Sequence, residues 1–151
     1  MKINELTDEQ LEKIFKENPE WVAKYHTLWV VDNYPHWMAD NYPHWMADNR
    51  PEWMAEYGSY WMIINRPEWM ADNRPELMGE RRTEWMLENR PDWMLENRPY
   101  WLSYHYPEWL INKHPELMIK YRSYWVKQHF PNLLSNFEID NVPDDILKII
   151  S

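Results

Sequence analysis

The chain of 151 residues contains no cysteine, only two glycines and no long apolar run. The lack of cysteine excludes disulfide bonds, thiolate metal sites and cysteine nucleophiles. No stretch approaches the ~20 apolar residues that span a membrane. The first residues, Met1 to Glu5, lack the apolar core of a signal peptide. The sequence therefore predicts a cytoplasmic protein.

Basic residues are also few: 16 lysines and arginines face 25 aspartates and glutamates, which gives a net charge of −9. Proteins bind nucleic acids and anionic membrane surfaces largely through a basic field. The charge therefore predicts that neither nucleic acid nor membrane is a partner.

Tryptophan, proline and methionine are abundant, and they recur with a period of eight. From Glu17 to Asn136 the chain divides into 15 contiguous octapeptides, here called octads. The commonest octad reads Asn-Arg-Pro-Glu-Trp-Met-Ala-Asp, and the octads 33–40 and 41–48 are identical. The sixth position is always Met, Val or Leu. All 12 tryptophans take the fifth position: Trp21, Trp29, Trp37, Trp45, Trp53, Trp61, Trp69, Trp85, Trp93, Trp101, Trp109 and Trp125.

These repeats predict an all-α solenoid of short helices built from 15 tandem octads, with a capping helix in residues 1–16 and a capping segment in 137–151. Few glycines and β-branched residues argue against a β-solenoid. Proline stands at the third position of 11 octads, and it begins a helix favourably but costs ~3 kcal/mol inside one. A continuous helix would also rotate each column by ~80° per octad. We therefore expect a break at each proline, with two-residue connections such as Asn73-Arg74.

Four octads have Ser or Thr in place of this proline: Thr27, Ser59, Thr83 and Ser123. They also lack the first-position asparagine, which tolerates the left-handed conformation that ends many helices. The pattern predicts helices that continue through two octads, near 19–32, 51–64, 75–88 and 115–128.

The two flanks have the composition of caps. Thr7 and Gln10 have the spacing of a capping box, and an apolar face follows at Leu11, Ile14 and Phe15. We expect this face to cover the first tryptophan octads. Ile146, Leu147 and Ile150 are expected to cover the last octads. With both ends covered, the protein is predicted to be a monomer or a small closed oligomer.

The tryptophan column has two interpretations, a stacking platform for ligands or a hydrophobic core. Leucine replaces tryptophan at positions 77, 117 and 133. A core accepts that exchange, whereas a stacking platform would lose an aromatic face. The pattern favours a core, with a minority of tryptophans lining an open groove.

Two further sets of side chains repeat in register. His36 and His44 take equivalent positions and could share a metal ion, but a metal site needs at least three ligands, so surface histidines are the favoured interpretation. Arginine recurs at the second position, where it could form a basic stripe for RNA. Acidic residues at the fourth and eighth positions favour a ladder of surface ion pairs instead. These arginines are Arg50, Arg66, Arg74, Arg82, Arg90, Arg98 and Arg122.

Residues 6–15, Leu-Thr-Asp-Glu-Gln-Leu-Glu-Lys-Ile-Phe, resemble the opening of an F-box, and residues 142–150 are similar. The resemblance implies docking to a ubiquitin-ligase adaptor. It covers only these two segments, because octads begin at Glu17. An amphipathic capping helix accounts for the same residues.

No hydrolase, phosphate-loop, dinucleotide or calcium-loop motif is present. The sequence therefore predicts no enzyme, and no catalytic, cofactor-binding or metal-binding residue. The favoured function is a repeat scaffold that presents the second, fourth, seventh and eighth positions to a protein or peptide partner. The alternative is binding of a small ligand or carbohydrate through exposed tryptophans.

Overall fold

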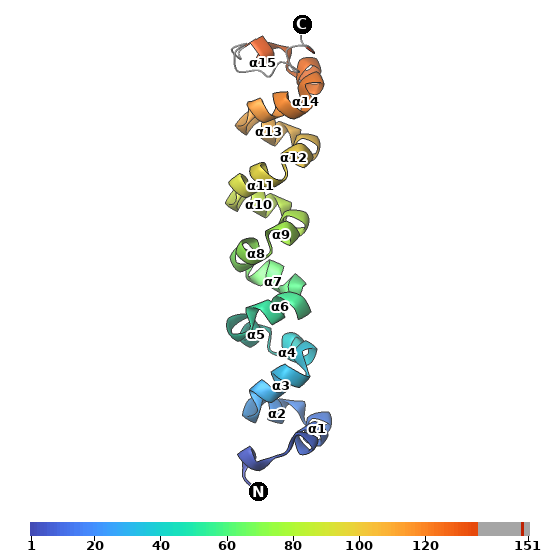
Figure 1. Cartoon of the computed structure of the whole chain (residues 1–151), viewed down its shortest axis with the longest axis vertical. Coiled ribbons are helices and arrows are strands. Elements are labelled where there is room, and N and C mark those ends of the chain that lie inside the picture. Colours follow the sequence, from blue (N-terminus) through green and yellow to red (C-terminus); the bar gives the residue numbers. More distant parts are fainter. Residues whose placement is uncertain (136–148, 150–151) are drawn as a thin grey trace. The chain divides into compact units, whose positions relative to one another are not determined.

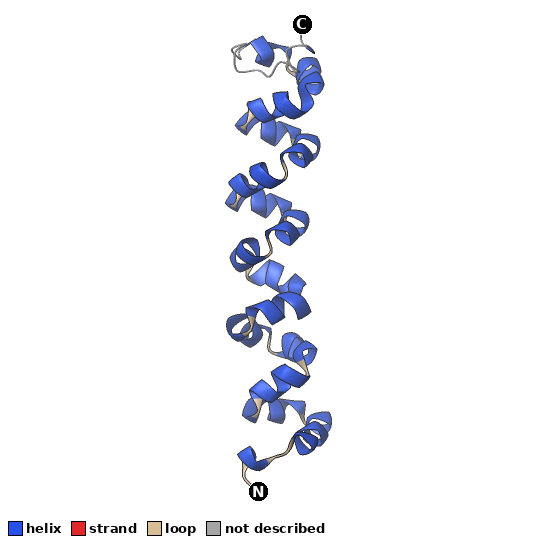
Figure 2. Ribbon diagram, in the orientation of Figure 1, coloured by secondary structure: helices blue, strands red, loops and turns tan. Residues whose placement is uncertain are grey.

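The computed structural model describes residues 1–135 and Ile149. These residues form α-helices and one short 3-10 helix, and none of them forms a strand (Figure 2). The prediction of an all-α repeat solenoid is confirmed. The chain divides into two compact units, Met1–Arg82 and Thr83–Ser151, which are described separately.

The helices follow the octads almost one for one (Figure 1). The first unit contains η1 (Ile3–Glu5), α1 (Asp8–Glu17), α2 (Pro19–Tyr25), α3 (Thr27–Asn33), α4 (Pro35–Asn41), α5 (Pro43–Asn49), α6 (Pro51–Tyr57), α7 (Ser59–Asn65), α8 (Pro67–Asn73) and α9 (Pro75–Arg81). The second contains α10 (Thr83–Asn89), α11 (Pro91–Asn97), α12 (Pro99–His105), α13 (Pro107–Lys113), α14 (Pro115–His129) and α15 (Pro131–Ser135). A typical octad helix therefore begins at the third position and ends at the first position of the next octad.

A single residue, at the second position of each octad, separates consecutive helices. Arg66 is representative, with φ −135° and ψ 53°. Its N–H donates to the Met62 carbonyl at 2.8 Å, and its own carbonyl accepts from the Met70 N–H at 3.0 Å. The chain thus bends at one residue without losing either of that residue's backbone hydrogen bonds, and the two-residue connections predicted from the sequence are wrong.

The prediction of helices that continue through 19–32, 51–64, 75–88 and 115–128 is also wrong. The backbone leaves helical geometry at His26 (φ −133°, ψ 47°), Gly58 (φ −132°, ψ 41°) and Arg82 (φ −135°, ψ 50°). Inside α14 it does so at Arg122 (φ −142°, ψ 48°). The break therefore occurs with Ser or Thr at the third position as it does with Pro, because every octad has to return its sixth residue to the same side of the helix stack.

Asparagine does not end these helices through a left-handed backbone, since no described residue has a positive φ. Instead, the amide of each first-position asparagine donates to the tryptophan carbonyl four residues earlier, at 2.8–2.9 Å. This bond holds the asparagine side chain along the last turn of its own helix. The asparagines are Asn33, Asn41, Asn49, Asn65, Asn73, Asn89 and Asn97.

The sixth and seventh positions, not the tryptophans, fill the core. From Val22 to Val126 every sixth-position side chain is only 0 or 1% exposed. The seventh position is buried in most octads and is often small, as at Ala71 and Ser103. The tryptophans are half-buried, and Trp53 is exposed. The interpretation of the tryptophan column as the core is therefore wrong: the fifth position lies ~100° around the helix from the sixth, so the indole covers the edge of the core.

Residues two to three octads apart meet on successive turns of the stack. In the first unit, Arg66 reaches Asp48, and the Trp61 ring lies 4.9 Å from that of His44. In the second unit, α12 contacts α14, and Arg122 bonds to the Ser103 carbonyl. These contacts place side chains from different helices on one surface.

The N-terminal helix expected from the sequence is α1, and its apolar face packs on the first octads. Thr7 and Gln10 form the capping box of α1, with reciprocal hydrogen bonds of 3.3 and 2.9 Å. Leu11 and Phe15 are buried, and Ile14 is half-buried. The Phe15 ring stacks on that of Tyr34 with centroids 4.0 Å apart. The C-terminal residues Ile146, Leu147 and Ile150 lie outside the described residues.

Ser59→Pro is expected to keep or raise the free energy of unfolding, by up to ~1 kcal/mol. Ser59 is the first residue of α7, where proline stands in most other octads, and a proline that fits the native backbone restricts the unfolded chain. Urea denaturation of the variant measures the change.

Ile64→Pro is the control, because Ile64 is exposed but lies inside α7. It should cost ~3 kcal/mol through the lost helical bond and the ring clash. Equal losses from the two variants would mean that α6 and α7 are one helix in solution.

Phe15→Ala is expected to lower the free energy of unfolding by ~3–5 kcal/mol, because a buried aromatic ring leaves a cavity between α1 and the first octads. Lys13→Ala, at an exposed position of the same helix, should stay within ~0.5 kcal/mol. A Phe15 variant as stable as the Lys13 variant would show that α1 does not cap the stack.

Candidate interaction surfaces

Most tryptophans are covered on one side by the residue five positions later, at the next junction. The Tyr34 ring lies 5.9 Å from that of Trp29, and the His114 ring lies 6.3 Å from that of Trp109. Arginine guanidinium groups lie over the rings of Trp61, Trp85 and Trp93 at 5.6–6.0 Å. The column is therefore a series of paired side chains and not an open stacking platform.

Trp53 departs from this arrangement because the residue five positions later is Gly58. Glycine supplies no side chain to cover the indole, and Trp53 is 36% exposed. The Tyr57 ring is nearly perpendicular to the indole, with centroids 6.4 Å apart and an interplanar angle of 75°. Trp53 is thus the tryptophan whose face is most available to a ligand within the described part of the chain.

The indole N–H groups are largely unused by the fold. Trp29 Nε1 donates to Asp8 at 3.1 Å. Within residues 1–135 no other indole N–H has a hydrogen-bond acceptor. None of these indole nitrogens is fully buried, because the buried side-chain nitrogen without a partner in those residues is His26 Nε2. The N–H groups of the half-buried tryptophans other than Trp29 are therefore open to solvent.

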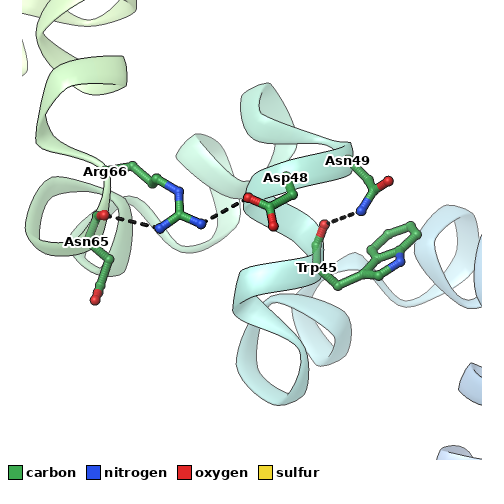
Figure 3. Close-up of polar contacts among 5 residues, drawn as sticks. All are labelled: Trp45, Asp48, Asn49, Asn65 and Arg66. Atoms are coloured by element: carbon green, nitrogen blue, oxygen red, sulfur yellow. Dashed lines mark hydrogen bonds and ion pairs between the residues drawn. The ribbon is translucent and has the colours of Figure 1, made fainter.

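The second-position arginines bond mainly to backbone carbonyls. Figure 3 shows Arg66 between the Asn65 carbonyl, at 3.2 Å, and Asp48, at 2.9 Å. Arg50, Arg74 and Arg90 bond in the same way to the asparagine before them. Arg82 and Arg122 reach carbonyls three octads earlier, at Ile63 and Ser103. The sequence predicted ion pairs for these residues, and their role as caps for junction carbonyls was missed.

The two equivalent histidines lie at separate aromatic contacts. The His36 ring meets the edge of Tyr57 at 4.5 Å, and the His44 ring meets Trp61 at 4.9 Å. Both histidines are exposed. Within the part of the chain that the structure describes, no three His, Asp or Glu side chains converge as metal ligands would.

The octad separates surface positions from structural ones. Every described fourth- and eighth-position residue is exposed, as the sequence predicted. The second and seventh positions were also expected on the surface; for the seventh position this is wrong in most octads, whereas the second-position residues are half-buried or exposed. Second-position side chains pack on tryptophan, and seventh-position side chains are buried. Surface chemistry therefore varies mainly through the fourth and eighth positions.

In the second unit, Tyr100, Tyr104 and Tyr124 stand at such positions in place of the usual carboxylates. Tyr100 and Tyr104 of α12 are 58% and 51% exposed, and Tyr124 of α14 is 66% exposed. The Tyr121 ring meets Tyr100 edge-on with centroids 6.3 Å apart. These four tyrosines together with Arg122 and Gln128 are here called the tyrosine surface.

Hydrogen bonds and stacking fix the tyrosine surface. The Tyr100 hydroxyl donates to that of Tyr104 at 3.3 Å, and this bond raises the pKa of Tyr100. The Arg122 guanidinium lies 4.1 Å from the centre of the Tyr104 ring, while its Nη1 donates to the Ser103 carbonyl at 3.2 Å. Gln128 donates to the Tyr124 hydroxyl at 2.7 Å. A hollow of about 360 Å³ lies among Tyr104, Tyr121, Arg122, Ser123, Tyr124, Trp125 and Gln128.

The first unit has a hollow whose walls are both apolar and basic. It measures about 670 Å³ and is lined by Ser59, Tyr60, Ile63, Ile64, Leu77, Arg81 and Arg82. Tyr60, at a fourth position, is 77% exposed. The sequence does contain a signal for both surfaces, because tyrosine replaces Glu or Asp at the fourth position of their octads.

Comparisons with protein-family models, with characterised proteins and with solved structures return no match for this chain. The resemblance of residues 6–15 to an F-box therefore has no support from a family model. None of the described helices is long and apolar enough to cross a membrane.

Arg66→Ala and Asp48→Ala are expected to show a coupling free energy under ~1 kcal/mol in a double-mutant cycle, since both side chains are partly solvated. The coupling should shrink as salt is raised, because ions screen exposed charges. Urea denaturation at two salt concentrations measures it.

Arg50 is the matched control, because it takes the same octad position and bonds to the Asn49 carbonyl, with no ion pair among the described residues. The stability loss of Arg50→Ala should not depend on salt. A salt-dependent loss at Arg50 equal to that at Arg66 would contradict the assignment of the ion pair to Asp48.

Proposed function

We propose that this protein is a non-enzymatic repeat scaffold that binds a protein or peptide partner, and that it acts as a monomer or a small closed oligomer. The tyrosine surface is the observation that carries the proposal. Tyrosine and arginine are enriched at protein interfaces, because they supply large contact areas and directed hydrogen bonds at a low cost in side-chain entropy.

The division of labour within the octad supports this proposal. The sixth- and seventh-position side chains form the core, and the residues at the first three positions form the bend between helices. The fourth and eighth positions are exposed and carry no part of either task. A scaffold of this kind can display a binding surface without disturbing its fold.

A catalytic role finds little support in the site chemistry. General acid–base catalysis uses titratable groups whose pKa values are shifted by burial or by charged neighbours. In residues 1–135 the buried polar side chains are Ser103 and Ser123. Ser103 is occupied by a hydrogen bond to the Tyr100 carbonyl. The absence of nucleic-acid and membrane partners and the cytoplasmic location stay predictions from the sequence.

Selection from a displayed library of random peptides of about 12 residues tests the proposal, since a segment of that length can cover a surface of two helices. The full chain should enrich a set of peptides, and Tyr104→Ser with Tyr124→Ser should weaken their binding by about tenfold or more. Glu52→Ser with Glu56→Ser, at the same octad positions of another octad, is the control. The absence of any enriched peptide would overturn the proposal.

Binding of a carbohydrate through tryptophan is the second candidate function, and Trp53 is the observation that favours it. Its indole lacks the cover that most tryptophans have at the next junction. A glycan array probed with the full chain and with Trp53→Ala tests this function: signals that disappear in the variant support it, and signals that persist exclude Trp53 as the site.

A further inference from the structure

The geometry points to an acidic peptide segment as the occupant of the tyrosine surface. This inference rests on the proposed function and adds the chemistry of the partner. The segment would place carboxylates against Arg122 and Lys120 and an apolar side chain in the hollow beside Tyr121 and Tyr124.

The local charge is the first argument. Between Pro99 and Ser135 the carboxylates are Glu108 and Glu116, and four cationic side chains share this stretch: Lys113, Lys120, Arg122 and Lys127. Glu116 lies 3.2 Å from the His114 ring nitrogen. The tyrosine surface therefore belongs to a basic stretch of a chain whose net charge is −9.

Arg122 is positioned to receive a carboxylate. Stacking on Tyr104 and the bond to the Ser103 carbonyl hold its guanidinium in place. A guanidinium has five N–H donors in a planar fork that matches a carboxylate. One of the five bonds to Ser103, so a bound carboxylate would meet donors that are already ordered.

Lys120 adds a second charge beside the surface. Its ammonium lies 5.2 Å from the centre of the Tyr121 ring, and its side chain is exposed. Tyr121 also lines the hollow. A segment that fills the hollow thus meets Arg122 in its wall and has Lys120 nearby, against the Tyr121 ring.

The size of the hollow fits a peptide. At about 360 Å³ it lies at the small end of the ~300–1,000 Å³ range of ligand sites. Tyr100 and Tyr104 are exposed and fixed by mutual contacts, so they would extend the contact beyond the hollow with little loss of side-chain freedom.

A peptide fits the charge of the whole chain better than a nucleic acid does. Duplex DNA carries a phosphate every ~1.7 Å along its axis, and such a polyanion would meet the acidic octads as well as the basic stretch. A short acidic peptide meets only charges within the Debye length of ~8–10 Å. For a short acidic peptide, attraction to the nearby basic side chains therefore outweighs repulsion by the negative net charge of the whole chain.

The enriched peptides from the displayed library provide the first measurement. They should carry a net negative charge and at least one large apolar residue. Replacing Asp and Glu by Asn and Gln in a synthetic, fluorescein-labelled copy should weaken binding to the full chain by about tenfold. Enriched peptides without net negative charge would overturn the inference and leave the scaffold function standing.

Lys120→Glu and Lys24→Glu form a matched pair for the second measurement. Lys24 also takes an eighth position and lies 5.2 Å from the centre of a tyrosine ring, that of Tyr25. Lys120→Glu should weaken binding of the acidic peptide by about threefold to tenfold, whereas Lys24→Glu should leave the affinity for the peptide unchanged. Both are surface changes, and equal urea midpoints would confirm equal folding. Equal affinities for the two variants would overturn the inference.

Arg122→Ala and Arg122→Lys give the third measurement. Loss of affinity in both variants supports recognition of the carboxylate by the planar guanidinium, provided that the urea midpoints show a folded chain. Unchanged affinity in Arg122→Ala would overturn the inference. The inference would also be overturned if a labelled single-stranded RNA of about 12 nucleotides bound more tightly than the acidic peptide at physiological salt, because this result would identify a nucleic-acid partner.

Discussion

The bend at the second position of each octad is the constraint on which the rest of the structure depends. A helix turns ~100° per residue, so eight residues leave a column ~80° out of register. One residue near φ −135° and ψ 50° ends each helix and starts the next. Its N–H and C=O still bond to the neighbouring helices, so the junction residue keeps both of its own backbone hydrogen bonds, and arginine side chains cap some of the carbonyls that the bend leaves open. The sixth residue therefore returns to the core in every octad.

The same constraint explains which parts of the fold could be predicted. The period, the helical class and the N-terminal cap follow from proline positions, composition and the Thr7–Gln10 pair. The prediction of continuous helices is wrong because the chain bends at Gly58 although Ser59 stands in place of proline. Proline is compatible with the bend but does not cause it. Met54 and Met62 are both buried, and one straight helix would have turned them ~80° apart.

The interior was mispredicted for a related reason. Tryptophan is the largest repeated side chain, and size suggested burial. Burial depends instead on the position around the helix, so Met70 lies in the centre of the core and Trp69 lies at its edge. One side of most indoles lies outside the core, and the second-position side chain at the next junction packs on it and covers it. Gly58 shows the consequence of omitting that cover, since Trp53 is exposed there.

The tyrosine surface could not be predicted from sequence spacing alone, because it joins α12 to α14 across an intervening helix. The signal that was present, tyrosine at the fourth position, acquires meaning only once the fourth and eighth positions are known to be exposed. Tyr100 and Tyr121 stand in different octads and meet through the solenoid turn.

An octad with this division of roles allows surface and interior to change independently. The identical octads 33–40 and 41–48 have the same side chains inside and outside. The octads 97–104 and 121–128 keep the tryptophan and an aliphatic sixth residue but exchange acidic surface residues for tyrosine. Because fourth-position side chains are exposed, such exchanges cost the fold little. A binding surface can therefore arise by substitution within an array whose geometry is already set by its junctions.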